Sequence, residues 1–129
     1  MYEMPKSKSD VAGDVFCAKC PARYLITKLS SKWSLLIIDA LKDGPMRNGE
    51  LMRFIDGISQ KMLTQTIKEL AEMKLVHRED HQTIPPHVVY SLTPLGEGLQ
   101  EKICSLDRWI EENVIAMVED NNSIPLKLI

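Results

Sequence analysis

The chain has 129 residues, of which 44% are hydrophobic and 26% charged, so we expect one globular domain with an apolar core. Aromatic residues make up only 5%, and no apolar run approaches the roughly 18 residues of a membrane span. This composition argues against an aromatic platform for single-stranded nucleic acid and against a membrane protein. Residues 1–10 are too polar for a signal peptide, so we expect a cytoplasmic protein with three thiols rather than a disulfide framework.

The net charge of −2 is distributed unevenly along the chain. Residues 21–90 hold ten basic and eight acidic side chains, whereas residues 91–129 hold three basic and seven acidic ones. Because attraction to phosphate acts locally, this division permits nucleic-acid binding by the first of these segments, although it does not prove it.

Helical periodicity predicts three helices in the first half of the chain, after a flexible arm at residues 1–14. Pro21 suits the first turn of a helix, which Ser30-Ser31 interrupts before capping the next one. The second helix stops at Gly44-Pro45, and a short third helix begins near Asn48. The expected apolar positions are Tyr24, Leu25 and Leu29, then Trp33, Leu36, Ile37, Ala40 and Leu41, then Leu51, Met52 and Ile55.

Residues 57–96 are the most informative part of the sequence. The turn Gly57-Ile58-Ser59 precedes a helical run at 60–73, for which Ser59 is a good N-cap. Strand composition at 75–78 and 88–92, separated by a charged segment with His and Pro, predicts a β-hairpin. The expected buried side of the helix is Met62, Leu63, Ile67, Leu70, Ala71 and Met73.

A long amphipathic helix is expected to begin at Thr93-Pro94 and to reach residue 119, before a tail at 120–129 that the pattern leaves unassigned. Its apolar positions are Leu95, Leu99, Ile103, Leu106, Ile110, Val114 and Met117. This is more apolar length than a small domain needs for its own core. We therefore expect a homodimer in which a second copy covers the helix, the alternative being a helix folded back onto its own domain.

A turn, a polar-faced helix and a hairpin, in this order, are the parts of a winged helix-turn-helix. The predicted fold is mainly α with a small β-hairpin wing, in one domain at residues 15–119 that includes the long dimerisation helix. In this architecture one helix enters the major groove of double-stranded DNA and the hairpin contacts the backbone.

The candidate DNA-binding residues lie on the helix at 60–73 and on its neighbours. Amide and basic side chains suit base edges and phosphates, although a solvated helix face would look similar. Arg47 is a candidate phosphate contact, and Arg78 and His81 are candidates in the hairpin. The full set is Arg47, Ser59, Gln60, Lys61, Thr64, Gln65, Lys68, Arg78 and His81.

Cys17 and Cys20 form a CxxC motif with three open interpretations. A zinc site would need a second close pair of ligands, but His77 and His81 are more than fifty positions away, so we expect no metal. Lys19 and a helix N-terminus favour the Cys20 thiolate, which is typical of a redox-sensing thiol that Cys17 can resolve or that pairs across a dimer. The third interpretation is a pair of inert cytosolic thiols. Cys104 is expected to serve packing.

The order and spacing of many short motifs resemble the HxlR-type winged helix-turn-helix transcriptional regulators of bacteria and archaea. The resemblance covers roughly residues 17–112, most of one domain. The matching positions are Cys20-Pro21, Lys32-Trp33, Leu36-Ile37-Ile38, Gly44, Arg47, Glu50-Leu51, Gly57-Ile58-Ser59, Lys61 to Gln65, Glu69-Leu70, Leu75-Val76, Arg78, Pro85-Pro86, Val88, Tyr90, Leu92-Thr93, Gly96 and Trp109.

The resemblance implies a homodimer on a palindromic operator and, in several members, control by an N-terminal cysteine that senses oxidants or electrophiles. A small-molecule or oxidant effector is therefore expected. The chain departs from the family at three places: Ser30-Ser31 replaces Gly-Gly, Asn48 replaces Phe, and Lys74 replaces Gly.

Two rival functions belong to other classes. A winged helix can be a protein-interaction module without DNA binding, and the overall acidity is compatible with that role. A small redox enzyme built on the CxxC motif would need a βαβ context, which is missing, and the sequence shows neither a phosphate-binding Gly-rich loop nor a Ser/His/Asp arrangement. We therefore predict that the chain is not an enzyme and needs no cofactor.

Overall fold

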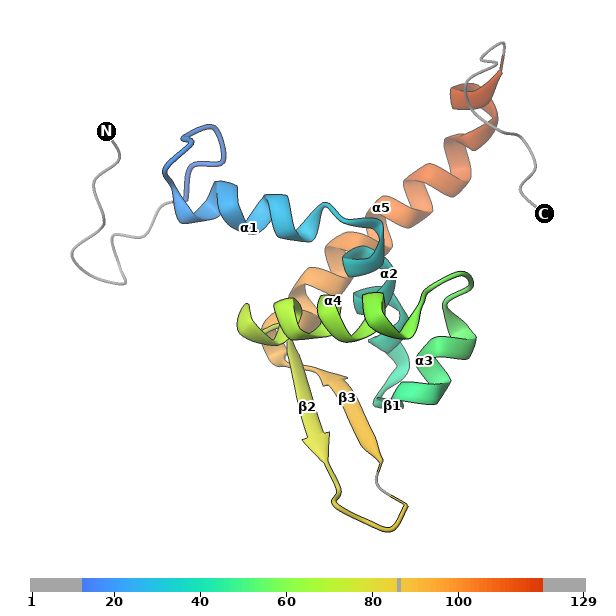
Figure 1. Cartoon of the computed structure of the whole chain (residues 1–129). Coiled ribbons are helices and arrows are strands. Elements are labelled where there is room, and N and C mark those ends of the chain that lie inside the picture. The colour runs from blue at the N-terminus through green and yellow to red at the C-terminus, as the bar shows by residue number, and fades with distance from the viewer. Residues whose placement is uncertain (1–12, 86, 120–129) are drawn as a thin grey trace.

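The computed structural model of the chain describes residues 13–85 and 87–119. Most of the expected N-terminal arm and all of the expected C-terminal tail therefore lie outside the described residues. In chain order the structure contains α1 (Pro21–Leu29), α2 (Lys32–Ala40), a 3-10 helix η2 (Leu41–Asp43), β1 (Met46–Arg47), α3 (Asn48–Phe54), α4 (Gln60–Glu72), β2 (Val76–Asp80), β3 (Val88–Leu92) and α5 (Pro94–Val118), as Figure 1 shows.

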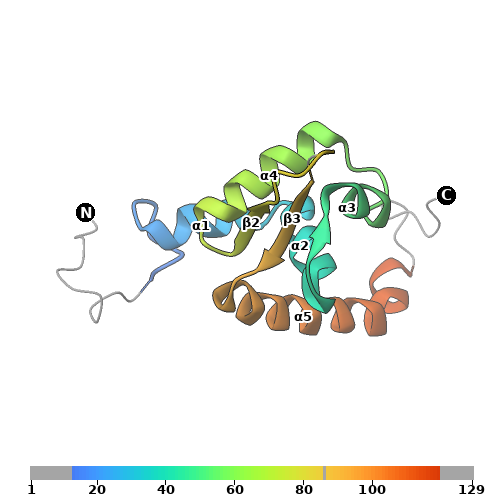
Figure 2. The same cartoon turned by 90° about the horizontal axis from the view of Figure 1, so that it is seen from below.

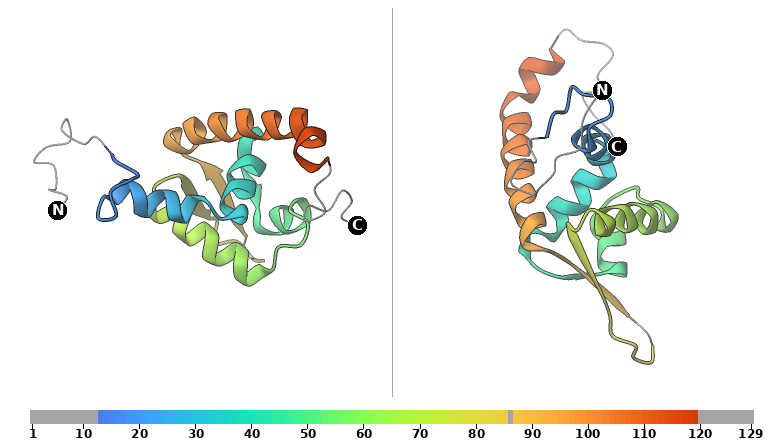
Figure 3. Two further views of the ribbon diagram at one scale, coloured as in Figure 1. Left: turned by 90° about the horizontal axis from the view of Figure 1, so that it is seen from above. Right: turned by 90° about the vertical axis from the view of Figure 1, so that its left-hand side faces the viewer.

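Helix α2 lies in the centre of the molecule, with α4 packed on one side and α5 on the other (Figure 2). Ser31 caps α2 by accepting a hydrogen bond from the backbone N–H of Trp33 at 3.2 Å, as the sequence predicts. Helix α1 and the C-terminal half of α5 extend away from this centre (Figures 1 and 3). None of the helices in the described residues is both long and apolar enough to cross a bilayer.

Helices α2 and α4 contribute three buried apolar side chains each to the core, and α3 contributes Leu51. Several apolar positions expected on α1, α2 and α4 are exposed: the exposed fraction is 61% for Tyr24, 39% for Leu25, 45% for Leu36 and 38% for Met62. The buried stripe of α4 also includes Thr66, and Leu36 and Met62 each lie one position, about 100° of helix, away from a buried residue. The fully buried large side chains include Ile37, Ile38, Leu41, Leu51, Leu63 and Leu70.

The sheet has three antiparallel strands in the order β1-β3-β2. β2 and β3 pair from Val76↔Leu92 to Asp80↔Val88 and form the predicted hairpin, which we call the wing together with residues 81–85 and 87. Strand β1 was not predicted, because two residues cannot show an alternating pattern; it pairs Met46 with Tyr90 and Arg47 with Val89. The wing projects from the body of the molecule in Figure 1.

Lys74, just after the C-cap of helix α4, adopts a left-handed backbone conformation with a φ of 63°. The backbone N–H of Lys74 donates to the Ala71 carbonyl and that of Leu75 to the Leu70 carbonyl, both at 3.0 Å, which is the Schellman arrangement. This geometry explains why the resemblance implies glycine at position 74. It also explains why β2 begins at Val76 and not, as predicted, at Leu75.

Polar contacts join α2 to α5. Gln100 Nε2 donates to Asp39 Oδ1 at 3.1 Å. A hydrogen bond with Asp39, together with partial burial and the negative charges of Asp39 and Glu111, raises the pKa of Asp107 from 3.8 to about 6, and Lys42 opposes this shift. The Asp107 carboxyl therefore keeps its proton in mildly acidic solution.

Candidate nucleic-acid interface

Helix α4 presents the polar face that the sequence predicts. Ser59 caps the helix by accepting a hydrogen bond from the backbone N–H of Met62 at 3.1 Å, so its hydroxyl oxygen is occupied within the protein. Figures 2 and 3 show that α4 lies at the outside of the molecule, where its outer face is uncovered. The predicted outward residues are all exposed: Gln60, Lys61, Thr64, Gln65 and Lys68.

An open groove of about 540 Å³ lies between α3, the N-terminal half of α4 and the wing. Three guanidinium-bearing residues line it: Arg47 before α3, Arg53 in the last turn of α3, and Arg78 on β2. Two carboxylate-bearing residues, Glu50 and Asp80, line it as well. Because the three cations come from separate elements, a phosphate backbone passing through the groove would meet positive charge on both walls.

Arg47 occupies the N-cap position of α3. Its backbone N–H donates to Glu50 Oε1 at 2.9 Å, which fixes the first turn and leaves the exposed guanidinium outside it. Arg78 makes a loose ion pair with Asp80, Nη2 to Oδ2 at 3.6 Å, and both side chains are partly exposed. Neither arginine is buried, so both remain able to bind an anion.

The side chain of Gln60 makes hydrogen bonds within the protein. Asn48 Nδ2 donates to Gln60 Oε1 at 2.7 Å, and Gln60 Nε2 donates to Asn48 Oδ1 at 3.1 Å and to Thr64 Oγ1 at 2.9 Å. These bonds tie the first turn of α3 to the first turn of α4. The side chains of Lys61 and Lys68, in contrast, make no hydrogen bond or ion pair with another described residue.

Histidine and threonine side chains order the tip of the wing. The rings of His81 and His87 stack with their centroids 4.8 Å apart, and Thr83 Oγ1 lies 2.9 Å from His87 Nδ1. His81 Nε2 also lies 3.9 Å from Glu79 Oε1. The predicted His81 is therefore exposed, and its ring stacks on the half-buried His87.

The structure adds Asn48, Arg53, His87 and Tyr90 to the groove, and the sequence analysis had identified none of them as a site residue. The four-residue spacing of Gly49 and Arg53 places the Arg53 guanidinium near Gly49, at the start of α3. That spacing predicts where Arg53 lies on the helix, but its place in the groove depends on the packing of α3 against the wing. The others become neighbours only through tertiary contacts between the wing and the two helices.

Cys20 occupies the N-cap position of α1, as the sequence indicates, but only 2% of its surface is exposed. The backbone N–H of Asp14 donates to Cys20 Sγ at 3.3 Å, and the backbone N–H of Cys20 donates to the Cys17 carbonyl at 3.1 Å. Cys17 is half-buried. Within the described ranges no three His, Cys, Asp or Glu side chains gather as a metal site would require.

Comparisons with known proteins agree with this architecture. The family model described as HxlR-like helix-turn-helix matches residues 28–117. The chain is 40% identical to the uncharacterised helix-turn-helix-type transcriptional regulator YtfH of Escherichia coli strain K12, over 88% of this chain and 90% of YtfH.

Solved structures that are similar to the chain include those of two regulators. That of the regulator YtfH of Salmonella typhimurium has a TM-score of 0.79 at 39% identity and covers 83% of this chain and 96% of that one. The redox regulator HypR in its oxidised form has a TM-score of 0.66 at 34% identity, covering 73% and 97%. The mainly helical winged fold, the family match and these relatives together show that the chain belongs to the HxlR-like helix-turn-helix family of transcriptional regulators.

Proposed function

We propose that the chain is a homodimeric transcriptional regulator that binds a palindromic DNA operator, with one α4 helix in the major groove of each half-site. The observation that carries this proposal is the groove in which Arg47, Arg53 and Arg78 converge beside the exposed polar face of α4. Arginines positioned in this way bind phosphates and fix the register of the protein, while the adjacent helix contacts base edges.

The hydrogen bonds within the site indicate which donors and acceptors remain for DNA, and so which role each residue has. Thr64 Oγ1 accepts from Gln60, so its hydroxyl proton is available for donation to a base or phosphate. Lys61, Lys68 and the wing histidine His81 supply charge to the backbone, whereas Gln65 is the side chain suited to a base edge. Gln60 and Ser59 support the geometry of the helix start and contact DNA through their remaining donors.

The dimer is proposed from exposed apolar side chains on two helices. On α1 the exposed fraction is 61% for Tyr24 and 49% for Ile26, and on α5 it is 54% for Trp109 and 70% for Ile115. A monomer would leave this surface in water, whereas a second copy would bury it. Sedimentation equilibrium tests this part: a monomer at micromolar concentration contradicts it.

Fluorescence anisotropy on a duplex that carries the chain's own upstream region tests DNA binding. We expect Arg53→Ala to weaken binding and to lower the slope of log K against log salt by about one, because one phosphate contact is lost. Arg108→Ala, on α5 away from the groove, removes the same charge and is the matched control. If Arg53→Ala binds like the wild type and like Arg108→Ala, the groove is not the phosphate-binding surface. If no duplex binds with a salt-dependent affinity, a winged-helix protein-interaction module is the better description.

We also propose that the cysteines of the α1 cap control DNA binding. HypR, with solved oxidised and reduced forms, is described as a redox regulator. Because Cys20 is buried and Cys17 is half-buried, an oxidant such as diamide meets Cys17 first. The two thiols then lose two protons and two electrons to the oxidant and form a disulfide, within one chain or between two copies.

Diamide treatment followed by mass spectrometry and an anisotropy titration tests this control. We expect the loss of two hydrogen atoms per disulfide and weaker operator binding, both of them absent from Cys17→Ser and Cys20→Ser variants. A Cys20→Ser variant that still leaves DNA on oxidation rules the proposal out.

A further inference from the structure

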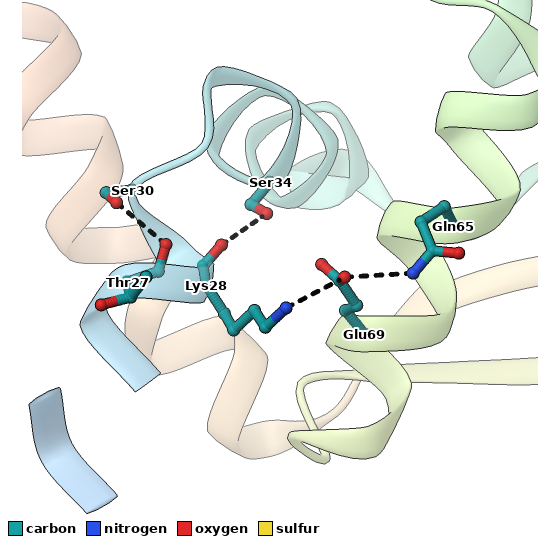
Figure 4. A network of polar contacts seen from close by, with 6 residues as sticks. All are labelled: Thr27, Lys28, Ser30, Ser34, Gln65 and Glu69. Carbon is teal, nitrogen blue, oxygen red and sulfur yellow. Dashed lines mark hydrogen bonds and ion pairs between the residues drawn. The ribbon is translucent and has the colours of Figure 1, made fainter. Parts of the chain in front are cut away.

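A network of polar contacts runs from the protein core to the exposed face of α4 (Figure 4). The hydroxyl of Ser34, which is 1% exposed, donates to the backbone carbonyl of Lys28 at 3.1 Å. Lys28 Nζ donates to Glu69 Oε1 at 3.4 Å, and Gln65 Nε2 donates to the same oxygen at 3.1 Å. We call these four residues the Ser34–Lys28–Glu69–Gln65 network.

The network connects α1 and α2 to the helix proposed to enter the major groove. Ser34 holds the main chain at Lys28, and Ser30 closes the end of α1 by donating to the Thr27 carbonyl at 3.0 Å. The side chains of Lys28 and Glu69 are 35% and 25% exposed, so the ion pair is partly shielded from water. The position of the Glu69 carboxylate is therefore set from outside α4.

The carboxylate determines which end of the Gln65 amide faces it. A glutamine amide has a donor end and an acceptor end, and its last torsion allows the two to exchange. A carboxylate only accepts hydrogen bonds, so the arrangement with Nε2 towards Glu69 is the one that forms a bond. The carbonyl oxygen and the second N–H of Gln65 are then left for an outside partner.

That donor and acceptor pair matches one base in the major groove. Adenine presents an N6 amino donor beside an N7 acceptor, and a glutamine amide can bond to both, whereas guanine presents two acceptors there. A glutamine whose amide is free to turn discriminates less between adenine and guanine, because one or other orientation can bond to either base.

We propose that Glu69, held by Lys28, is a positioning residue that fixes the polarity of the Gln65 amide so that Gln65 recognises adenine in each operator half-site. This inference rests on the proposed DNA-binding function. Its consequence is that α1, which lies outside the helix-turn-helix, contributes to sequence specificity through Lys28.

Selection of preferred sequences from a randomised duplex library tests the proposal. The wild type is expected to prefer adenine at one position per half-site, and Gln65→Ala is expected to abolish that preference. Glu69→Gln replaces the carboxylate by an amide of the same shape that can donate or accept, so we expect the preference at that position to fall about tenfold. Lys28→Met, which removes the partner of Glu69, is expected to lower it in the same direction.

Glu72→Gln is the matched control, because it removes the same charge one turn further along, where Glu72 is exposed. It is expected to leave every base preference unchanged. Binding to non-specific DNA and the melting temperature measure any general loss of charge or fold, and we expect Glu69→Gln and Glu72→Gln to match each other in both.

The outcomes separate this inference from the function on which it rests. If the wild type selects a sequence but Glu69→Gln keeps the same preference, or if the position that depends on Gln65 is not adenine, the positioning role is overturned and the DNA-binding function stands. If the wild type selects no sequence, the proposed function itself fails.

Discussion

Replacing Gly96 by alanine is expected to destabilise the protein, because α5 passes too close to the start of the wing for any side chain there. Thr93 caps α5 by accepting from the Gly96 N–H at 3.0 Å, and its own backbone N–H donates to the Leu75 carbonyl at 3.0 Å. A Cβ at Gly96 would overlap that carbonyl oxygen and lie 3.1 Å from the Leu75 carbonyl carbon and 3.3 Å from Leu92 Cδ2.

The size of the effect follows from what must move. The carbonyl belongs to the main chain and cannot rotate away as a flexible side chain can. Overpacking of this kind costs about 1–3 kcal/mol, and weakening the bond between Thr93 and Leu75 costs about 1 kcal/mol. The better helix propensity of alanine offsets up to about 1 kcal/mol of this cost. The net loss is about 1–4 kcal/mol, or a fall in melting temperature of roughly 4–15 °C.

Thermal unfolding followed by circular dichroism measures this change. Gly98→Ala is the matched control, since it lies on the same helix and a Cβ there has no neighbour within 4 Å. We expect Gly98→Ala to raise the stability by about 0.5–1 kcal/mol. If Gly96→Ala unfolds at the same temperature as Gly98→Ala, the close contact between Gly96 and the Leu75 carbonyl is contradicted.

Two further substitutions test the end of α4 and the contact between α2 and α5. Lys74→Gly removes the strain of a side chain in the left-handed conformation and should stabilise the protein by about 1 kcal/mol in urea unfolding. Lys68→Gly, inside α4, is its control and should destabilise the protein by about as much. Because the pKa of Asp107 is raised from 3.8 to about 6, its contribution to stability is complete below pH 3.8 and is lost as the pH rises through about 6. Asp107→Asn should therefore unfold like the wild type near pH 4 and be more stable at pH 8, by about 1 kcal/mol after allowance for solvent screening. The same melting difference between Asp107→Asn and the wild type at both pH values would contradict the raised pKa of Asp107.

Local signals in the sequence predicted most of the elements of the fold. Ser31 and Ser59 are N-caps as expected, and α5 begins where Thr93-Pro94 indicated, with Thr93 as its N-cap, because capping depends on a side chain and the two or three residues after it. The burial of Leu36 and Met62 was predicted wrongly, because the apolar stripe of a short helix can be drawn in more than one way until its packing partners are known.

The candidate site was predicted only in part, for a similar reason. The exposed face of α4 follows from periodicity within one helix, so the exposure of Thr64, Gln65 and Lys68 was predicted correctly. Arg53 joins the groove through the packing of α3 against the wing, and the bonds between Asn48 and Gln60 join residues twelve positions apart. Contacts of this kind leave no mark in the local pattern of one sequence.

The most direct test of the central proposal is a footprint of the wild-type protein on an operator selected from random duplex DNA. We expect protection of two inverted half-sites whose centres lie about one turn, ~34–36 Å, apart, with an affinity that falls steeply as salt is raised. A library that yields no common sequence, or a protected site without two-fold symmetry, would contradict a paired helix-turn-helix that binds a palindrome.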